Sequence, residues 1–175
     1  MLFTCNHEEA DYRMVHHASL EDTTCIVKSK DTDVLMLLAY EYAKIKPESN
    51  WYMLYDNDNY ADIKQITSHL GNDISLSLPQ FHSVTGCDTT SYFFNHGKVS
   101  IFKKILSNPF HVELIKEIGS EPVLADEFVN NTVKFVQTVI YSGFHNESYV
   151  ETRVRLYKRQ KNKSSLHIPP DPDSC

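Results

Sequence analysis

Three clusters of acidic side chains are the residues of this sequence best suited to chemistry. The stretches HEEAD, SKDTD and TGCD supply, in order, Glu8, Glu9 and Asp11, then Asp31 and Asp33, and finally Asp88. Carboxylates that converge are costly to keep charged unless a divalent cation lies between them. Carboxylate oxygens are also the ligands that Mg²⁺ and Mn²⁺ prefer. The clusters therefore predict a Mg²⁺ or Mn²⁺ site, provided that the fold brings them together.

Each cluster also has a purely structural interpretation. Aspartate and glutamate are common at helix N-termini, where free N–H groups and the helix dipole favour negative charge. Asp31 and Asp33 lie between an apolar run that ends at Val27 and another that starts at Val34. Taken singly, each cluster is better explained as a helix cap, and only the joint spacing of the three favours a metal site.

The hydrophobic pattern predicts the elements that would position these residues. Two short apolar runs, residues 24–29 and 51–55, have the length and composition of β-strands. Helical spacing and stop signals such as Pro47 and Gly71 predict helices at residues 7–18, 33–45, 60–70, 78–84, 89–95, 99–106, 110–118 and 122–141. The expected order is helix, strand, helix, strand and then helices, which is an α/β layer followed by a helical section.

Two strands are too few for a parallel sheet flanked by helices, so we expect the N-terminal strands of this sheet to be missing from the chain. Residues 1–145 are expected to form the folded part. Residues 146–175 combine a basic stretch from Arg153 to Lys163 with the end IPPDPDSC, and this composition predicts a tail or linker.

Composition limits the class of protein. The chain has 175 residues, 41% hydrophobic residues and a net charge of -6, which fits one globular domain. Its four cysteines are spread singly, so neither a zinc ribbon nor a disulfide framework is predicted. No apolar run reaches the roughly 18 to 20 residues of a membrane span, and the N-terminus lacks the pattern of a signal peptide. We expect an intracellular protein that does not bind membranes.

The joint spacing of the acidic clusters resembles the second half of the flap endonuclease and XPG-like nucleases, a branch of the PIN-like fold. In that family a Glu-x-Glu pair opens a helix, an Asp-x-Asp loop follows a strand, and a Gly-x-Asp leads into a helix-two-turn-helix unit. Glu9 and Asp11 match the first pair, with Glu8 as a substitute. Asp31 and Asp33 match the loop, and Gly86-Cys87-Asp88 matches the third signal, which puts the helix-two-turn-helix unit at residues 86–107. The sequences of these stretches also resemble nuclease-like domains of proteins derived from mobile elements.

The resemblance implies hydrolysis of phosphodiester bonds by two Mg²⁺ or Mn²⁺ ions. Glu9, Asp11, Asp31, Asp33 and Asp88 would be the catalytic metal ligands, with Glu8 as a further ligand. Gly97, Lys98, Lys103 and Lys104 would contact the nucleic-acid backbone. The implied partner is DNA, with RNA as the other option, and the implied location is the nucleus.

Two features depart from the family pattern. The family carries further catalytic aspartates before its Glu-x-Glu segment, and this chain begins only six residues before His7. The resemblance therefore leaves open whether this chain is active by itself or only within a longer parent. Asn95 stands where the family has the first glycine of a Gly-x-Gly turn; asparagine is the next most tolerant residue for positive φ.

Two other functions stay open. The chain could be a non-catalytic DNA-binding or interaction module derived from a mobile element, which would bind DNA without Asp33. An Asp-x-Asp pair after a strand is also found in phosphatases of the haloacid dehalogenase type. In this third interpretation Asp31 would be the nucleophile. The sequence predicts nothing about the oligomeric state.

Overall fold

The computed structural model describes residues 10–20, 23–45, 48–87, 92–93, 95–118, 126–142, 146–160 and 168–169. Contacts divide the chain into two compact units, Met1–Pro79 and Gln80–Cys175. We describe each unit by itself. The described part is a mixed α/β structure, as predicted, with a small sheet in unit 1. No helix of the described part is long and apolar enough to cross a membrane.

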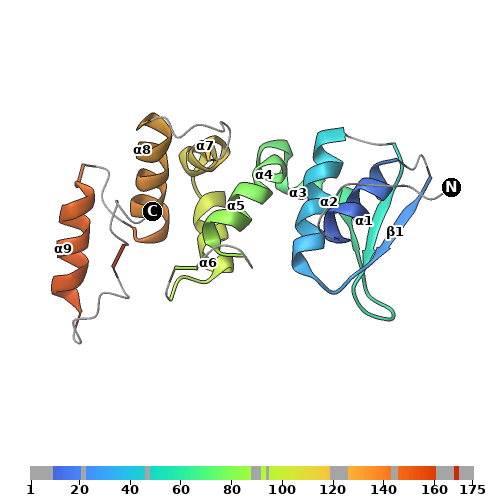
Figure 1. Ribbon diagram of the computed structural model, residues 1–175, viewed down its shortest axis with the longest axis horizontal. Helices are drawn as coiled ribbons and strands as arrows, with labels where there is room; N and C mark the ends of the chain where they lie inside the picture. The colour runs from blue at the N-terminus through green and yellow to red at the C-terminus, as the bar shows by residue number, and fades with distance from the viewer. Residues whose placement is uncertain are drawn as a thin grey trace. The chain divides into compact units, whose positions relative to one another are not determined.

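The sheet of unit 1 has three strands in the order β1 (Cys25–Lys28), β2 (Trp51–Leu54) and β3 (Tyr60–Asp62). β1 and β2 are parallel, with Lys28 opposite Leu54, and β2 and β3 form an antiparallel hairpin. Both predicted strands are therefore confirmed, and Figure 1 shows them beside the helices of this unit.

The helices of unit 1 are α1 (Ala10–Ser19), α2 (Thr32–Ile45), α3 (Ile63–Leu70) and α4 (Asn72–Leu76). α1 and α3 both pack against α2, and α1 also contacts β1. The side chains of Val27, Trp51 and Met53 alternate along the strands with more exposed residues, and they are buried. Together with the fully buried side chains of α2, these residues form the core of unit 1.

The predicted helix at 60–70 is wrong in its first turn, because Tyr60–Asp62 is β3. The backbone N–H of Tyr55 donates to the carbonyl of Asn59 over 3.1 Å, and this bond closes the hairpin. Asp62 then caps α3 by accepting the N–H of Gln65 over 2.9 Å. Gly71 ends α3 with a φ of 79°, as predicted, whereas α4 was not predicted.

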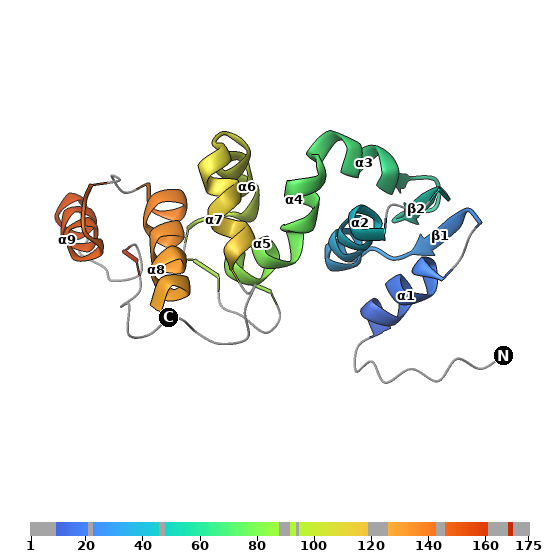
Figure 2. The same ribbon diagram turned by 90° about the horizontal axis from the view of Figure 1, so that it is seen from above.

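Unit 2 is helical in its described part. Its elements are α5 (Leu78–Thr85), which starts just before the boundary, α6 (Lys98–Leu106), α7 (Pro109–Glu117), α8 (Asp126–Phe135), the π-helix η1 (Val136–Ile140) and α9 (Tyr149–Arg159). Figure 2 shows α6, α7 and α8 as neighbours, and the contacts join α6 to α7 and α7 to α8. The predicted helices at 99–106 and 110–118 are confirmed.

Two predictions for unit 2 need correction. Of the helix expected at 89–95, Tyr92, Phe93 and Asn95 are described, and none of them is helical; the other four residues lie outside the described ones. The tail expected from residue 146 contains α9. Ser148 and Glu151 form a capping box at its start, in which each side chain accepts the other residue's backbone N–H. This local signal outweighs the polar composition that favoured a tail.

Candidate functional site

Asp31 and Asp33 lie where the chain leaves β1 and enters α2. The Asp31 carboxylate accepts the backbone N–H of Asp33 through Oδ1 over 2.9 Å, and the Asp31 N–H donates to Ser29 Oγ over 3.1 Å. Asp31 is therefore the N-cap of α2, which satisfies one of the unpaired donors of the first turn. The structural interpretation of this cluster is confirmed for Asp31, whose exposed carboxylate still has a second oxygen.

Asp11 lies in the first turn of α1 and is half-buried. α1 packs against both β1 and α2. Figures 1 and 2 show the beginning of α1 toward the end of β1 from which the chain continues to α2. The first and second acidic clusters are thus on elements in mutual contact, and their described members lie toward the same end of β1.

The described carboxylates do not by themselves form a metal centre. Among the residues described, no three His, Cys, Asp or Glu side chains are grouped closely enough to hold an ion. Glu8, Glu9 and Asp88, which the resemblance would add to the ligand set, lie outside the described residues. The donor chemistry fits Mg²⁺ or Mn²⁺, but the described geometry does not complete such a site.

Two further carboxylates, outside the three acidic clusters, lie at the same edge of the sheet. Asp56 and Asp58 are exposed in the loop between β2 and β3. Because Lys28 and Leu54 are paired in register and the Ser29 N–H donates to the carbonyl of Leu54 over 3.1 Å, both parallel strands end together. The signal that could have found Asp56 and Asp58 is their position directly after the second of two parallel strands.

Unit 1 is also strongly acidic as a whole. Residues 1–79 contain 13 acidic and 6 basic side chains, whereas residues 80–175 contain 10 acidic and 11 basic ones. The net negative charge of the chain therefore arises in the unit that carries Asp11, Asp31 and Asp33. A field of this sign attracts cations and repels nucleic acid unless cations intervene.

Close packing explains why residue 86, in the third acidic cluster, is a glycine. Gly86 has a φ of 102°, and a Cβ at this position would lie 2.7 Å from the Cβ of Tyr92. A side chain at residue 86 would therefore be both strained and in collision with the backbone and side chain of Tyr92. This position, two residues before Asp88, therefore requires glycine, and Asp88 itself lies outside the described residues.

The turn before α6 adopts the conformation that its sequence allows. Asn95 has a φ of 59°, which confirms that asparagine can take the positive value that the turn needs. Gly97 is the N-cap of α6 and has an ordinary φ of -71°. The exposed Lys98 follows it, and the Lys98 Nζ lies 3.3 Å from the Nδ1 of His82. Gly97 and Lys98 are thus at a helix start, where backbone N–H groups and a cation suit a phosphate.

Lys103 and Lys104 are adjacent in sequence but differ in their surroundings. Lys103 is exposed. The Lys104 Nζ donates to the carbonyls of Val139 and Ile140 over 2.9 and 3.0 Å and to Ser142 Oγ over 3.0 Å. Burial lowers the pKa of Lys104. Its ammonium group therefore joins α6 to the carbonyl end of the π-helix.

The basic segment after residue 148 is anchored by a polar network. The Arg155 guanidinium pairs with the Glu147 carboxylate over 2.8 Å, and Thr152 Oγ1 donates to the same carboxylate over 2.9 Å. The buried Gln137 on the π-helix donates from Nε2 to Thr152 Oγ1 over 2.9 Å and to the carbonyl of Glu147 over 2.6 Å. The basic residues of α9 are consequently held on an ordered helix.

Comparison of the chain with models of protein families, with curated proteins and with solved structures gives no match.

Proposed function

We propose that this chain is a divalent-cation-dependent nuclease that hydrolyses phosphodiester bonds in nucleic acid, with DNA as the expected substrate. The supporting observation is the placement of Asp31 and Asp33 at the end of β1 in a parallel strand pair, with Asp11 on a helix that packs against both flanking elements. Sites in open α/β sheets lie beyond the carboxyl ends of the strands. The finer fold assignment, a PIN-like domain, and a nuclear location belong to the same proposal.

The proposed roles of the residues come from the resemblance, and for Asp31 they agree with its contacts. Bound Mg²⁺ or Mn²⁺ would activate water and stabilise the leaving oxygen, and Asp11, Asp31 and Asp33, together with Glu8, Glu9 and Asp88, would be the ligands. The bond from the Asp33 N–H fixes the orientation of the Asp31 carboxylate. Capping uses one carboxylate oxygen and leaves the other for a cation.

Contacts to the nucleic-acid backbone would come from the exposed Lys98 and Lys103 and from the helix start at Gly97. Lysine contacts to phosphate supply affinity that falls with salt concentration and does not depend on base sequence. Lys104, with its three intramolecular acceptors, is not among these residues in the proposal.

Cleavage of labelled flap and hairpin DNA in the presence of Mg²⁺ or Mn²⁺ tests the proposal. We expect the wild-type chain to cut in a cation-dependent manner and the Asp31→Asn/Asp33→Asn double variant to lose this activity. The Glu48→Gln/Asp73→Asn variant removes equal charge from exposed positions of unit 1 outside the loops that follow β1 and β2, and it serves as the matched control. No cleavage by the wild-type chain, or equal cleavage by the first double variant, would contradict the proposal.

A second candidate is a DNA-binding module without catalysis. It is favoured by one observation, namely that the described carboxylates do not group into a metal centre whereas Lys98 and Lys103 are exposed. This candidate predicts binding that survives Asp31→Asn/Asp33→Asn and weakens in the Lys98→Ala/Lys103→Ala variant. The slope of log K against log salt concentration is negative, and each lost phosphate contact should reduce its magnitude by about 1.

A further inference from the structure

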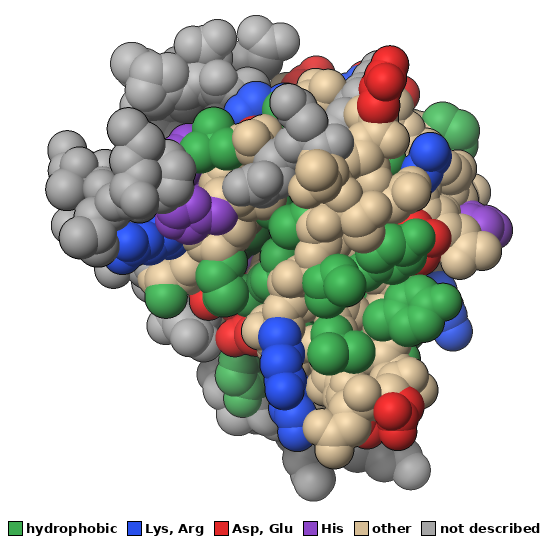
Figure 3. Space-filling model, turned by 90° about the vertical axis from the view of Figure 1, so that its right-hand side faces the viewer, with side chains coloured by type: hydrophobic (Ala, Val, Ile, Leu, Met, Phe, Trp, Pro, Cys, Tyr) green, Lys and Arg blue, Asp and Glu red, His purple; other side chains and the backbone are tan. Residues whose placement is uncertain are grey.

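The sheet of unit 1 has one face that the described helices do not cover. Val27, Trp51 and Met53 are buried on one side, whereas the alternate residues face the other, and we call these the open sheet face: Ile26, Lys28, Tyr52, Leu54 and Tyr60. Ile26 is 67% exposed and Tyr60 is 62% exposed. The rings of Tyr52 and Tyr60 meet edge to face at 5.5 Å, which places both on this side. Figure 3 shows hydrophobic side chains gathered on the side of the molecule that carries β1.

An exposed apolar sheet face of this kind is expected to be covered by another surface. Sheets with parallel strands are normally covered on both faces, because their strands are apolar on both sides. Contiguous exposed apolar side chains rimmed by polar residues are typical of interaction surfaces. Acidic residues border this face at one end, since Asp56 and Asp58 lie in the loop that follows β2.

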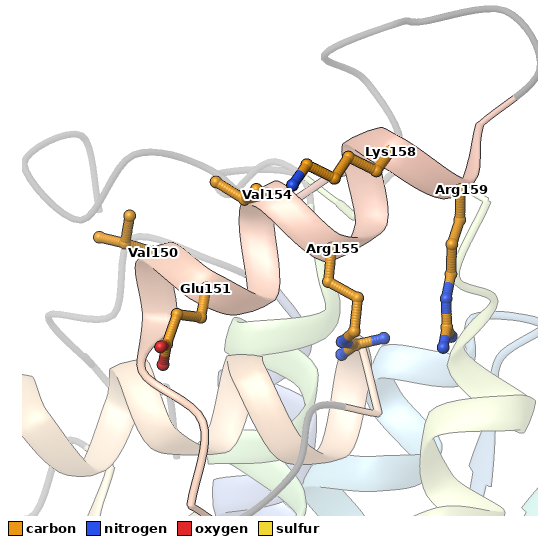
Figure 4. Close-up of a pocket in the computed structure, with 6 residues that line it drawn as sticks. All are labelled: Val150, Glu151, Val154, Arg155, Lys158 and Arg159. Carbon is orange, nitrogen blue, oxygen red and sulfur yellow. The ribbon is translucent and has the colours of Figure 1, made fainter.

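α9 in unit 2 carries a second apolar stripe that faces solvent. Tyr149 and Thr152 are buried, but Val150, Val154 and Tyr157, at positions i, i+4 and i+7 of the helix, are exposed. Val150 is 64% exposed and Val154 is 45% exposed. Figure 4 shows Val150, Val154 and Lys158 projecting from one side of α9 and Arg155 and Arg159 from the other. A groove of about 450 Å³ runs along this helix, lined in its described part by Val150, Glu151, Val154, Arg155, Lys158 and Arg159.

α9 and the unit that carries the sheet are opposite in net charge, and the two surfaces are similar in size. α9 contains four basic side chains and one acidic one, whereas unit 1 carries more than twice as many acidic as basic residues. The 11 residues of α9 span roughly 16 Å at 1.5 Å per residue. Three strands with their side chains cover a width of roughly 14 Å at about 4.8 Å per strand. A helix laid on the sheet would therefore place its apolar stripe over the apolar centre and its cations near the acidic rim.

We propose that this chain associates with itself, and that the stripe formed by Val150, Val154 and Tyr157 on α9 of one copy docks on the open sheet face of another. Each copy then offers one helix and one sheet face. Such an unlike pair of surfaces either closes reciprocally into a dimer or extends into longer assemblies. Pairing of like surfaces, sheet with sheet or helix with helix, is a different interface, and mixing experiments separate the two.

The test uses full-length chains with one surface disabled at a time. In the helix variant, Val150→Glu/Val154→Glu places acidic groups on the stripe; in the sheet variant, Ile26→Lys/Tyr60→Lys places basic groups on the open sheet face. Sedimentation velocity from about 1 μM to about 1 mM covers the usual range of weak self-association. We expect the mass of the wild-type chain to rise with concentration, and each variant alone to weaken association at least about 100-fold.

An equimolar mixture of the two variants is the decisive sample, because it contains one intact helix stripe and one intact sheet face. We expect it to form a one-to-one heterodimer with the affinity of the wild-type interface, which a misfolded variant could not do. Val129→Glu, at an exposed position of α8, is the matched control and should associate like the wild type. A wild-type chain that stays monomeric, self-association of either variant alone, or a monomeric mixture would overturn the proposal.

Discussion

At the scale of single residues, Asp31 combines a structural task with a proposed chemical one, and the two can be separated. Its carboxylate accepts the Asp33 N–H at the start of α2. Asp31→Ala removes this acceptor and should lower the free energy of unfolding by about 1 kcal/mol. Asp31→Asn keeps a side-chain oxygen and should change it by only a few tenths of a kcal/mol. Urea unfolding measures both, and equal losses in the two variants would show that charge rather than the cap stabilises the helix.

Gly86 and Gly97 flank the segment around Asp88, and they differ in their tolerance of a side chain. Gly86→Ala forces a Cβ to within 2.7 Å of the Tyr92 Cβ at a positive φ, and it should cost at least about 1–3 kcal/mol of stability. Gly97→Ser is the control, since space around Gly97 is open and serine is a good N-cap. Thermal unfolding should show a lower midpoint for the first variant and a midpoint close to that of the wild type for the second.

Lys103 and Lys104 provide another matched pair. Lys104→Met leaves the carbonyls of Val139 and Ile140 without their donor, which should lower the free energy of unfolding by about 1–3 kcal/mol. Lys103→Met, at an exposed position, should change it by less than about 0.5 kcal/mol. Chemical denaturation distinguishes the two outcomes, and equal stability of both variants would contradict the structural role of Lys104.

At the scale of elements, the capping box of α9 should make the stability of this helix depend on pH. The hydrogen bond from the Ser148 backbone N–H holds the pKa of Glu151 below its ordinary value near 4.5. A carboxyl with a lowered pKa stabilises the folded state above its ordinary pKa, and the effect is lost as pH falls through the folded value. The wild-type chain should therefore be more stable than Glu151→Gln at pH 7, and the difference should shrink well below pH 4.5. A difference in urea unfolding that does not change with pH would contradict this assignment.

The elements also show how far sequence patterns reach. α2, α6 and α7 were predictable because each has an apolar stripe and a clear start or stop, such as the proline at the start of α7. β3 was missed because Tyr60–Asp62 is too short to show alternation, and its pairing with β2 is a tertiary contact. α9 was missed because its basic composition hid a capping box that is visible in the sequence.

In the candidate site, too, local patterns were predictable and tertiary contacts were not. The sequence predicted that Asp31 and Asp33 lie at a strand end before a helix, because both elements have strong patterns. The sequence did not predict that Asp56 and Asp58 lie near Asp31, because their position relative to Asp31 depends on the parallel register of β1 and β2. Nor could it show that Lys104 is used inside the protein, since its acceptors are about 35 residues further along the chain.

At the scale of the whole molecule, the chain separates its charges. Unit 1 concentrates the acidic residues, including those proposed to bind cations, and the basic residues proposed to contact phosphate lie in unit 2. Divalent cations should therefore affect binding as well as cleavage, because they reduce the repulsion between unit 1 and a polyanion. Measurements of DNA affinity are needed beside measurements of rate in order to separate these effects.

Single-turnover cleavage of a DNA substrate, with DNA affinity measured in the same buffer, is the most direct test of the proposed nuclease. We predict that the wild-type chain cleaves in Mn²⁺ and that Asp31→Asn/Asp33→Asn lowers the rate by more than about 100-fold. Loss of a residue that only hydrogen-bonds to a metal ligand already costs up to about 100-fold, and Asp31 and Asp33 are proposed to be ligands themselves. DNA affinity and folding of that variant should stay close to those of the wild type. A wild-type chain that binds DNA without cutting it, or a double variant that cuts at the wild-type rate, would contradict the account.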